Sequence, residues 1–188
     1  MPMSAARAWR ARLSRLGRNA RRHCRQLIVE RLEGRALLAT LPPGFSETAV
    51  ATGLSSATAM EFAPNGDLWV LEQTGAVKRF RPNNPTADVV GNISSLGLDS
   101  SGERGLLGIA FDPQYATTKQ VYLYYTATSP TTHNRIGRFT VDNTVATDYF
   151  FASSNGIPTQ TVIFDLDSLS GATNHNGGAI HFGPDDEL

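Results

Sequence analysis

The sequence has almost no cysteine and no long hydrophobic run. Cys24 is the only cysteine among 188 residues, so neither an intramolecular disulfide framework nor a cysteine-based zinc site is available. No stretch approaches the ~20 consecutive apolar residues that span a bilayer. The sequence therefore predicts a protein that is not an integral membrane protein and whose fold is held by core packing.

Net charge is also absent, because 17 basic residues balance 17 acidic ones. With 40% hydrophobic and 9% aromatic residues, the composition excludes collagen, mucin and wholesale disorder. The neutral total hides two opposite segments. Residues 1–40 contain ten Arg and two Glu, which leaves seven basic and fifteen acidic residues for 41–188. The chain thus divides into a basic leader, 1–40, and an acidic domain, 41–188.

The basic leader has two interpretations, a nucleic-acid-binding arm and an export or transit segment. No aromatic platform accompanies it and the following domain is acidic, so we expect no nucleic-acid partner. The apolar run from Ala36 to Leu41 is short for a secretory core of ~7 to 15 residues. However, Arg31 to Ala39 resembles the Leu-Glu-x-Arg-x-Leu-Leu signature of exported planctomycete proteins, with Gly34 where Pro or Asp is more usual. This resemblance implies a bacterial protein exported to the periplasm, the cell surface or the medium.

Beyond the leader, short β-type segments alternate with Gly, Pro, Asn and Asp. The pattern predicts strands over Glu47–Thr52, Asp67–Leu71, Ala76–Arg81, Leu106–Phe111, Val121–Thr126, Arg135–Val141 and Thr161–Phe164. Between the second and third of these, Gln73-Thr74-Gly75 supplies the glycine that a three-residue hairpin loop needs. No helical period follows residue 40, so the expected fold class is all-β.

A repeat organises these strands. Phe62, Phe111 and Phe182 each precede one small or polar residue, a proline and a polar turn, at spacings of 49 and 71 residues. A propeller blade takes ~40 to 50 residues, so residues 41–188 amount to about three blades. The chain ends at Leu188 within the third repeat. We therefore expect the N-terminal part of a larger protein or a truncated product.

Two longer motifs carry a family resemblance. Ser101–Tyr115 reads SGERGLLGIAFDPQY and Asn174–Asp185 reads NHNGGAIHFGPD, with the strand Val121–Tyr125 and the segment Arg135–Phe139 in order between them. Together they resemble the glucose/sorbosone dehydrogenase family. That family consists of soluble quinoproteins, six-bladed β-propellers that oxidise aldoses or related sugars with pyrroloquinoline quinone (PQQ) and calcium. The resemblance implies that residues 41–188 are about three blades of such a propeller.

The resemblance also implies a catalytic site around His175. Removing a hydroxyl proton as hydride leaves carbon calls for a base near neutral pH, and imidazole is suited to this role. His175 matches the catalytic base of the family, and Asn174 and Asn176 flank it with groups that can hydrogen-bond sugar hydroxyls. Gly177 and Gly178 would let a ligand approach the backbone. Without the resemblance, the same residues describe an Asn-rich turn with an exposed histidine.

Glu103 and Asn174 are the expected substrate-binding residues. Glu103 stands where the soluble glucose enzymes of the family have Gln and several aldose relatives have an acid. Asn174 stands where the glucose enzymes have Asp. Both departures argue against strict glucose specificity and leave the sugar open.

Other candidates have ordinary structural explanations. Gly105 and Gly108 are expected to allow close packing, because neither their spacing nor a following helix fits a phosphate loop. Arg104 beside Glu103 is expected to form a surface ion pair of ~0 to 1 kcal/mol. His133 is expected in an exposed loop, with the substrate mouth as the alternative.

We expect no metal site in this chain. His175 and His181 are too far apart along a strand to share a metal, and no third ligand is evident. The acidic side chains near the C-terminus do not have the spacing of a calcium loop and are expected in solvated turns: Asp165, Asp167, Asp185, Asp186 and Glu187.

By resemblance, the groups that hold PQQ and calcium come largely from later blades. The expected function is therefore PQQ-dependent oxidation of an aldose, or of a related polyol or aldehyde, with a sugar substrate and an external electron acceptor as partners. The 188-residue chain alone is expected to be inactive. The alternative is a non-catalytic secreted or cell-surface propeller that acts as a binding module.

Overall fold

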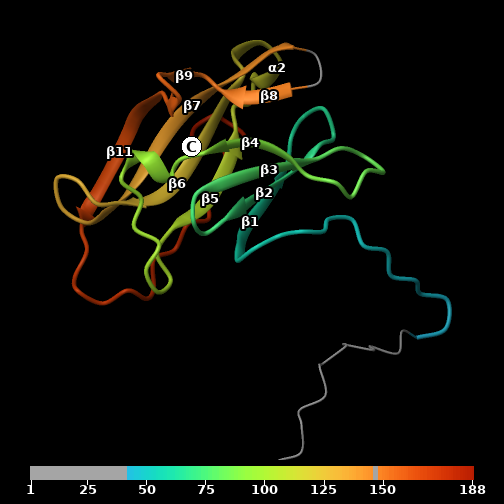
Figure 1. Ribbon diagram of the computed structural model, residues 1–188, viewed down its shortest axis with the longest axis horizontal. Helices are drawn as coiled ribbons and strands as arrows, with labels where there is room; N and C mark the ends of the chain where they lie inside the picture. The colour runs from blue at the N-terminus through green and yellow to red at the C-terminus, as the bar shows by residue number, and fades with distance from the viewer. Residues whose placement is uncertain (1–41, 146–147) are drawn as a thin grey trace, which may run out of the picture. The chain divides into compact units, whose positions relative to one another are not determined.

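The computed structural model describes residues 42–145 and 148–188, and the side chains of 143–150 are not part of the description (Figure 1). Contacts divide the chain into Met1–Phe45 and Ser46–Leu188, and the strands of the described residues belong to the second unit. The predicted leader, 1–40, lies outside the described residues. No helix in the described ranges is long and apolar enough to cross a membrane.

Two larger antiparallel sheets and one two-stranded sheet make up the described part of the second unit. The first sheet has the order β1-β2-β3-β4 and consists of β1 (Ala57–Phe62), β2 (Leu68–Glu72), β3 (Ala76–Phe80) and β4 (Asp88–Asn92). The second sheet has the order β11-β7-β6-β5 and consists of β5 (Leu106–Phe111), β6 (Gln120–Ala127), β7 (His133–Val145) and β11 (Gln160–Ser168), with β8 (Asp148–Phe151) also paired to β7. The remaining elements are short: η1 (Ser94–Leu96), α2 (Tyr115–Thr118) and the strands of the two-stranded sheet, β9 (Ser153–Ser154) and β10 (Ile157–Pro158). The described fold is therefore all-β, as expected.

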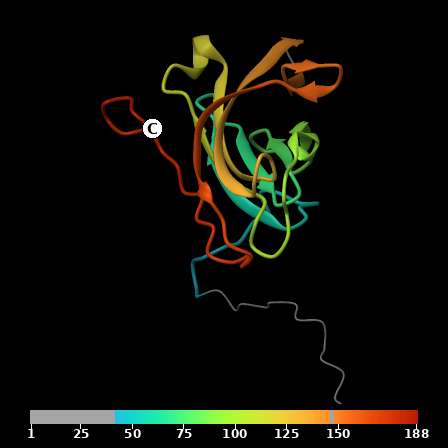
Figure 2. The same cartoon turned by 90° about the vertical axis from the view of Figure 1, so that its left-hand side faces the viewer.

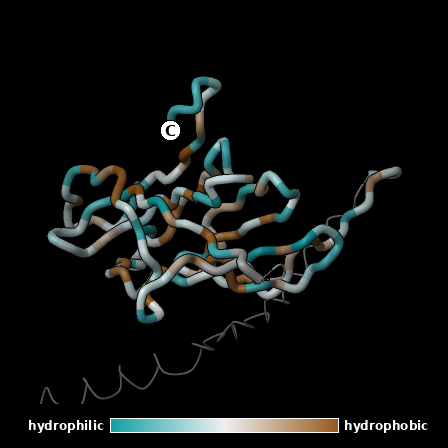
Figure 3. The backbone as a smooth tube through the Cα atoms, turned by 90° about the horizontal axis from the view of Figure 1, so that it is seen from above, coloured by the Kyte–Doolittle hydropathy of each residue, from teal (hydrophilic) through white to brown (hydrophobic). Residues whose placement is uncertain are grey.

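The first strands of the two sheets, β1 and β5, lie next to each other (Figure 1). The Thr58 hydroxyl of β1 donates a hydrogen bond of 2.6 Å to the Leu106 carbonyl of β5. Beyond this contact, a single buried cluster draws on both sheets. At its margin the Trp69 and Phe111 rings meet edge to face with centroids 5.2 Å apart. The hydropathy colouring of Figure 3 shows brown segments in the interior of this unit.

Strand alternation explains which residues reach that core. Trp69 and Leu71 of β2 are buried in the shared cluster, whereas Leu68 and Val70 belong to a smaller cluster on the opposite face of the sheet. The shared cluster contains Ala63, Trp69, Leu71, Val77, Val90, Ile93, Leu106, Ile109, Tyr115, Val121, Leu123, Tyr125, Ala127, Phe139, Val141 and Phe151. Both faces of β2 are thus buried, which is why its sequence is an unbroken apolar run.

The predicted hairpin is confirmed. β2 pairs antiparallel with β3 across the loop Gln73-Thr74-Gly75. Gly75 has φ of 105°, and its N–H donates to the Glu72 carbonyl at 2.9 Å. A Cβ on Gly75 would lie 3.0 Å from the Ser94 nitrogen, so the glycine also allows the following η1 turn to approach.

The three Phe-x-Pro repeats form the same turn. In each, the residue after the Phe (Ala63, Asp112 or Gly183) accepts a hydrogen bond from the N–H three residues further on, at 2.8, 2.8 and 3.1 Å. The N–H of that same residue donates to a carbonyl beyond the turn, at 2.8, 3.1 and 2.7 Å. This carbonyl lies four residues after the donor in the first and third repeats and eight residues after it in the second, because α2 is inserted there. The sequence repeat is therefore a structural repeat.

All but one of the predicted strands lie on observed strands. The prediction for Glu47–Thr52 is wrong, since the structure has no strand there. A strand needs backbone hydrogen bonds to a neighbouring strand, whereas Thr52 of this segment donates from its side-chain hydroxyl to the Pro85 carbonyl. The chain before Phe182 is likewise irregular, whereas β1 and β5 end at the corresponding Phe62 and Phe111. Figure 2 shows this red C-terminal segment running outside the sheets.

Candidate functional site

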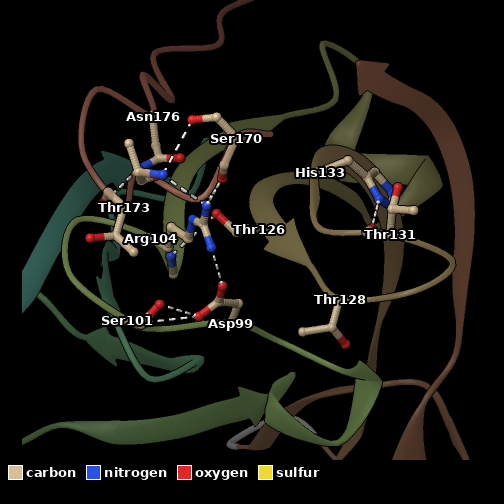
Figure 4. Close-up of polar contacts among 12 residues, drawn as sticks. Asp99, Ser101, Arg104, Thr126, Thr128, Thr131, His133, Ser170, Thr173 and Asn176 are labelled. Carbon is tan, nitrogen blue, oxygen red and sulfur yellow. Dashed lines mark hydrogen bonds and ion pairs between the residues drawn. The ribbon is translucent and has the colours of Figure 1, made fainter. Parts of the chain in front are cut away.

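Two loops far apart in the sequence lie against each other and hold the predicted site residues. We call them the 99–105 loop, which leads into β5, and the 170–176 loop, which follows β11. The Glu103 N–H donates to the Thr173 carbonyl at 2.8 Å. Gly102 allows this approach, because a Cβ there would lie 2.2 Å from the Thr173 hydroxyl oxygen. Figure 4 shows the two loops meeting around Arg104.

Glu103 and His175 are brought together across this contact. The His175 N–H donates to the Glu103 carboxylate, with 2.7 Å between the nitrogen and Oε2. His175 has φ of 63°, a left-handed conformation that is uncommon for a residue with a side chain. The charged hydrogen bond stabilises this conformation. The imidazole itself is exposed, and so is the neighbouring Asn174.

Asn176 differs from its neighbours, and its predicted contact with a sugar is wrong. Only 7% of the residue is exposed. Its side-chain amide donates to the Thr173 carbonyl at 3.1 Å. Its own carbonyl accepts from the Tyr124 hydroxyl at 3.0 Å and from the Asn134 amide at 3.3 Å. Burial raises the pKa of Tyr124, so this hydroxyl remains a donor. Asn176 therefore fixes the end of the 170–176 loop.

Arg104 is not the surface partner of Glu103 that the sequence suggested. It is 6% exposed and lies between the two loops (Figure 4). Nη1 lies 2.8 Å from Asp99 Oδ2, and Nη2 donates to the carbonyls of Ser170 at 2.7 Å and Ala172 at 2.9 Å. Hydrogen bonds from Ser101 and Arg104 hold the pKa of the Asp99 carboxyl below its usual range. The sequence placed Arg104 wrongly because the two carbonyls that it binds lie more than 60 residues further along the chain.

The predicted packing role of two glycines is confirmed. A Cβ on Gly105 would lie 2.5 Å from the Gln73 carbonyl oxygen, and a Cβ on Gly108 would lie 1.8 Å from the Gly178 carbonyl oxygen. Gly178 itself meets Leu107 of β5. The chain just after His175 therefore packs directly against β5 at Gly178. Gly177 differs, since a Cβ there would meet nothing within 4 Å.

His133 is not an exposed loop residue, and Asp165 lies on β11 and not in a turn, although its side chain is exposed. His133 begins β7, is 3% exposed, and has Nδ1 2.6 Å from the Thr131 carbonyl oxygen. Its Nε2 lies 3.1 Å from Asp165 Oδ1 on β11. Arg135 binds both oxygens of Asp165, at 2.5 and 2.9 Å, and thereby lowers the pKa of that carboxyl. The cluster ties β7 to β11.

The described residues do not fit a complete cofactor site. Calcium takes about six to eight oxygen ligands, and no group of three or more His, Cys, Asp or Glu that could hold a metal occurs in ranges 42–145 and 148–188. His181 is largely exposed, 3.8 Å from Glu61 Oε2. Arg104, the cation next to the site, is already bound to Asp99 and to carbonyls. What the chain offers is an exposed carboxylate, imidazole and amide: groups suited to a polyhydroxyl substrate.

Two clefts in the described unit are lined by other residues. One, about 470 Å³, follows β11 from Phe164 to Leu169. Another, about 370 Å³, lies between β1, β5 and residues 177–181. Neither is lined by Glu103, Asn174 or His175. Glu103, Asn174 and His175 are all exposed, so the predicted site lies on the surface of the described part of the chain.

The antiparallel sheets and the repeated turn define an all-β protein built from a recurring strand unit. The Glucose / Sorbosone dehydrogenase family matches residues 54–188, and the chain belongs to that family.

Relatives with known names agree with this assignment. The chain is 24% identical over 148 residues to quinoprotein glucose dehydrogenase B of Acinetobacter calcoaceticus, covering 77% of this chain and 30% of that protein. A solved structure of the PQQ-bound aldose sugar dehydrogenase of Streptomyces coelicolor matches with a TM-score of 0.61 and 34% identity, over 74% of this chain and 38% of that one. A putative oxidoreductase (glucose dehydrogenase) of Thermus thermophilus matches with a TM-score of 0.58 and 26% identity, over 74% of this chain and 37% of that one. The chain spans about a third of the length of these relatives.

Proposed function

We propose that this chain provides the substrate side of a PQQ-dependent sugar dehydrogenase. The observation that carries the proposal is the 2.7 Å hydrogen bond by which Glu103 holds the backbone of His175. It joins the two long motifs of the sequence at one point on the surface. The family assignment and the similarity to a PQQ-bound aldose sugar dehydrogenase support it.

His175 is the proposed base. Oxidation of a sugar hydroxyl to a carbonyl removes the hydroxyl proton together with a hydride from carbon. The exposed imidazole of His175 is free to take that proton. Because its backbone N–H, and not its ring, is bound to Glu103, the ring keeps its proton-accepting nitrogen.

Glu103 and Asn174 are the proposed substrate-binding residues. Oε2 of Glu103 accepts from His175, which leaves Oε1 to accept a hydrogen bond from a sugar hydroxyl. The exposed Asn174 amide both donates and accepts, as a vicinal diol requires. The proposed substrates are aldoses, or related polyols or aldehydes, and an external acceptor reoxidises the enzyme.

PQQ, when bound, supplies the acceptor for the hydride, and calcium polarises it. Since the described residues lack a fitting ligand set, we propose that other parts of the complete protein hold both groups. The exposed position of His175 is compatible with that arrangement. The exported location proposed from residues 1–40 suits a soluble enzyme of this kind.

We further propose that the two larger sheets are the first blades of a six-bladed propeller, and that residues 174–188 begin a third. The common hydrogen-bond pattern of the three Phe-x-Pro turns supports this. The face of the first sheet opposite the shared cluster supports it too. That face is only partly covered, since it carries an apolar groove of about 390 Å³ lined by Val50, Val70 and Met60, and Met60 is 67% exposed. A further blade would cover such a face.

Reconstitution tests the function. The complete gene product would be titrated with PQQ and calcium, and reduction of a dye would be followed with a panel of aldoses and polyols. Saturable quinone binding with sugar-dependent dye reduction is the expected result. A folded protein that binds no quinone would overturn the proposal and favour the alternative, a non-catalytic binding module.

A further inference from the structure

Arg104 is a buried cation for which the proposed reaction has no use. It lies 6% exposed between the 99–105 and 170–176 loops. Asp99 neutralises it through a 2.8 Å contact with Nη1. Nη2 then bridges two backbone carbonyls, those of Ser170 and Ala172 (Figure 4). Burying a charge costs free energy unless the charge is paired and hydrogen-bonded, so the buried guanidinium requires Asp99 and the two carbonyls in these positions.

The 170–176 loop depends on such side-chain contacts, because it belongs to no strand or helix. One planar guanidinium binds the carbonyls of Ser170 and Ala172 at 2.7 and 2.9 Å. The carboxylate of the adjacent Glu103 then binds the N–H of His175 at 2.7 Å. Two consecutive residues therefore hold the start and the end of the same loop. A shift at Ser170 and Ala172 would carry His175 with it.

We propose that Arg104 is a positioning residue for His175: its guanidinium, neutralised by Asp99, holds the carbonyls of Ser170 and Ala172 and so sets the place of the imidazole. The proposal rests on the proposed role of His175 as base. Arg104 itself touches no substrate. Lysine cannot replace it, since a single ammonium group lacks the planar set of donors that reaches Asp99 and both carbonyls at once.

The test is Arg104→Lys in the complete gene product, with Arg79→Lys as the matched control. Arg79 is also a buried arginine, 1% exposed and 2.7 Å from Asp88, but it lies on β3 in the first sheet. Both variants keep the positive charge and lose a buried guanidinium. Only Arg104→Lys is expected to alter the 170–176 loop.

Hydrogen exchange is the first measurement, because it needs neither cofactor nor turnover. In Arg104→Lys, peptides covering 170–176 are expected to exchange about tenfold faster than in the wild type, the factor for losing one charge-assisted hydrogen bond. In Arg79→Lys these peptides should exchange as in the wild type. Equal exchange of 170–176 in the two variants would overturn the proposal.

Kinetics is the second measurement. Arg104→Lys is expected to lower kcat about 10- to 100-fold, the usual cost of a misplaced reacting group, with quinone binding unchanged. Arg79→Lys should keep the wild-type kcat at a temperature where it is folded. If His175→Ala retains full activity, the proposed function fails whatever Arg104 does. If His175→Ala is inactive and Arg104→Lys behaves like Arg79→Lys, only the positioning role fails.

Asp99→Asn keeps the proposal testable if Arg104→Lys does not fold. The amide has the shape of the carboxylate but leaves Arg104 without its counter-charge. Faster exchange in 170–176 is again expected. Unchanged exchange in a folded Asp99→Asn protein would contradict the proposal.

Discussion

Replacing Glu103 is the sharpest local perturbation of the site. Its carboxylate accepts a hydrogen bond of 2.7 Å from the His175 N–H, and His175 holds φ of 63°. A hydrogen bond to a charged group contributes about 1.5 to 3 kcal/mol, and a neutral one about 0.5 to 1.5 kcal/mol. Because Glu103 is exposed, we take the lower end of the charged range. Glu103→Ala should therefore lose about 1.5 kcal/mol of loop stabilisation, roughly a tenfold change in the population of the held conformation.

Two variants and two assays separate the possible effects. Glu103→Ala should reduce kcat/KM at least tenfold, because positioning and a substrate contact are lost together. Glu103→Gln keeps an acceptor oxygen and should lose only a few-fold. Exchange of the His175 amide, followed by NMR without substrate, reports positioning alone and should accelerate in the Ala variant. Unchanged amide exchange in Glu103→Ala would refute the idea that the carboxylate holds His175.

Three further perturbations address the fold. Gly108→Ala places a Cβ 1.8 Å from the Gly178 carbonyl oxygen, so we expect about 1 to 3 kcal/mol of destabilisation by urea unfolding; a neutral result would contradict the close contact. Leu71→Ala, at a site with 0% exposure, should cost about 2 to 5 kcal/mol, and a loss below 1 kcal/mol would mean that the core is misplaced. Hydrogen bonding to Arg135 lowers the pKa of Asp165 in the folded state. The ion pair therefore contributes to folding stability at pH values above the ordinary pKa of 3.8, and this contribution is lost as the pH falls through the lowered pKa. Asp165→Asn should thus be less stable than the wild type at pH 7, with the difference vanishing in acid; a constant difference would exclude the ion pair as the cause.

Strong local patterns were sufficient to predict most strands. β2 and β5 are apolar runs bounded by turn residues, and their predicted positions agree with the structure. β4 was missed because Asp88, Gly91 and Asn92 are poor strand formers. Its glycine is required by packing, since a Cβ on Gly91 would lie 2.4 Å from the Phe151 ring. The residue that requires this glycine, Phe151, lies on β8, so the sequence around Gly91 does not indicate the requirement.

In the candidate site, too, the sequence motifs predicted some features, whereas contacts with distant residues decided others. The two motifs pointed to Glu103 and His175, and the structure brings them together. The roles of Arg104 and Asn176 were misjudged because burial of a polar side chain is decided by distant partners. Arg104 finds its carbonyls at Ser170 and Ala172, and no pattern in the 99–105 loop indicates them. His133 was placed in an exposed loop for the same reason.

The most direct test of the central claim compares two histidines on one segment. His175→Ala and His181→Ala would be made in the complete gene product, loaded with PQQ and calcium, and assayed for aldose-dependent dye reduction. Both imidazoles are exposed, but only His175 is held by Glu103. General-base catalysis contributes about 10²- to 10⁴-fold, so we predict a loss of that size in His175→Ala, with quinone binding intact, and wild-type turnover in His181→Ala. Equal activity of His175→Ala and the wild type would contradict the account.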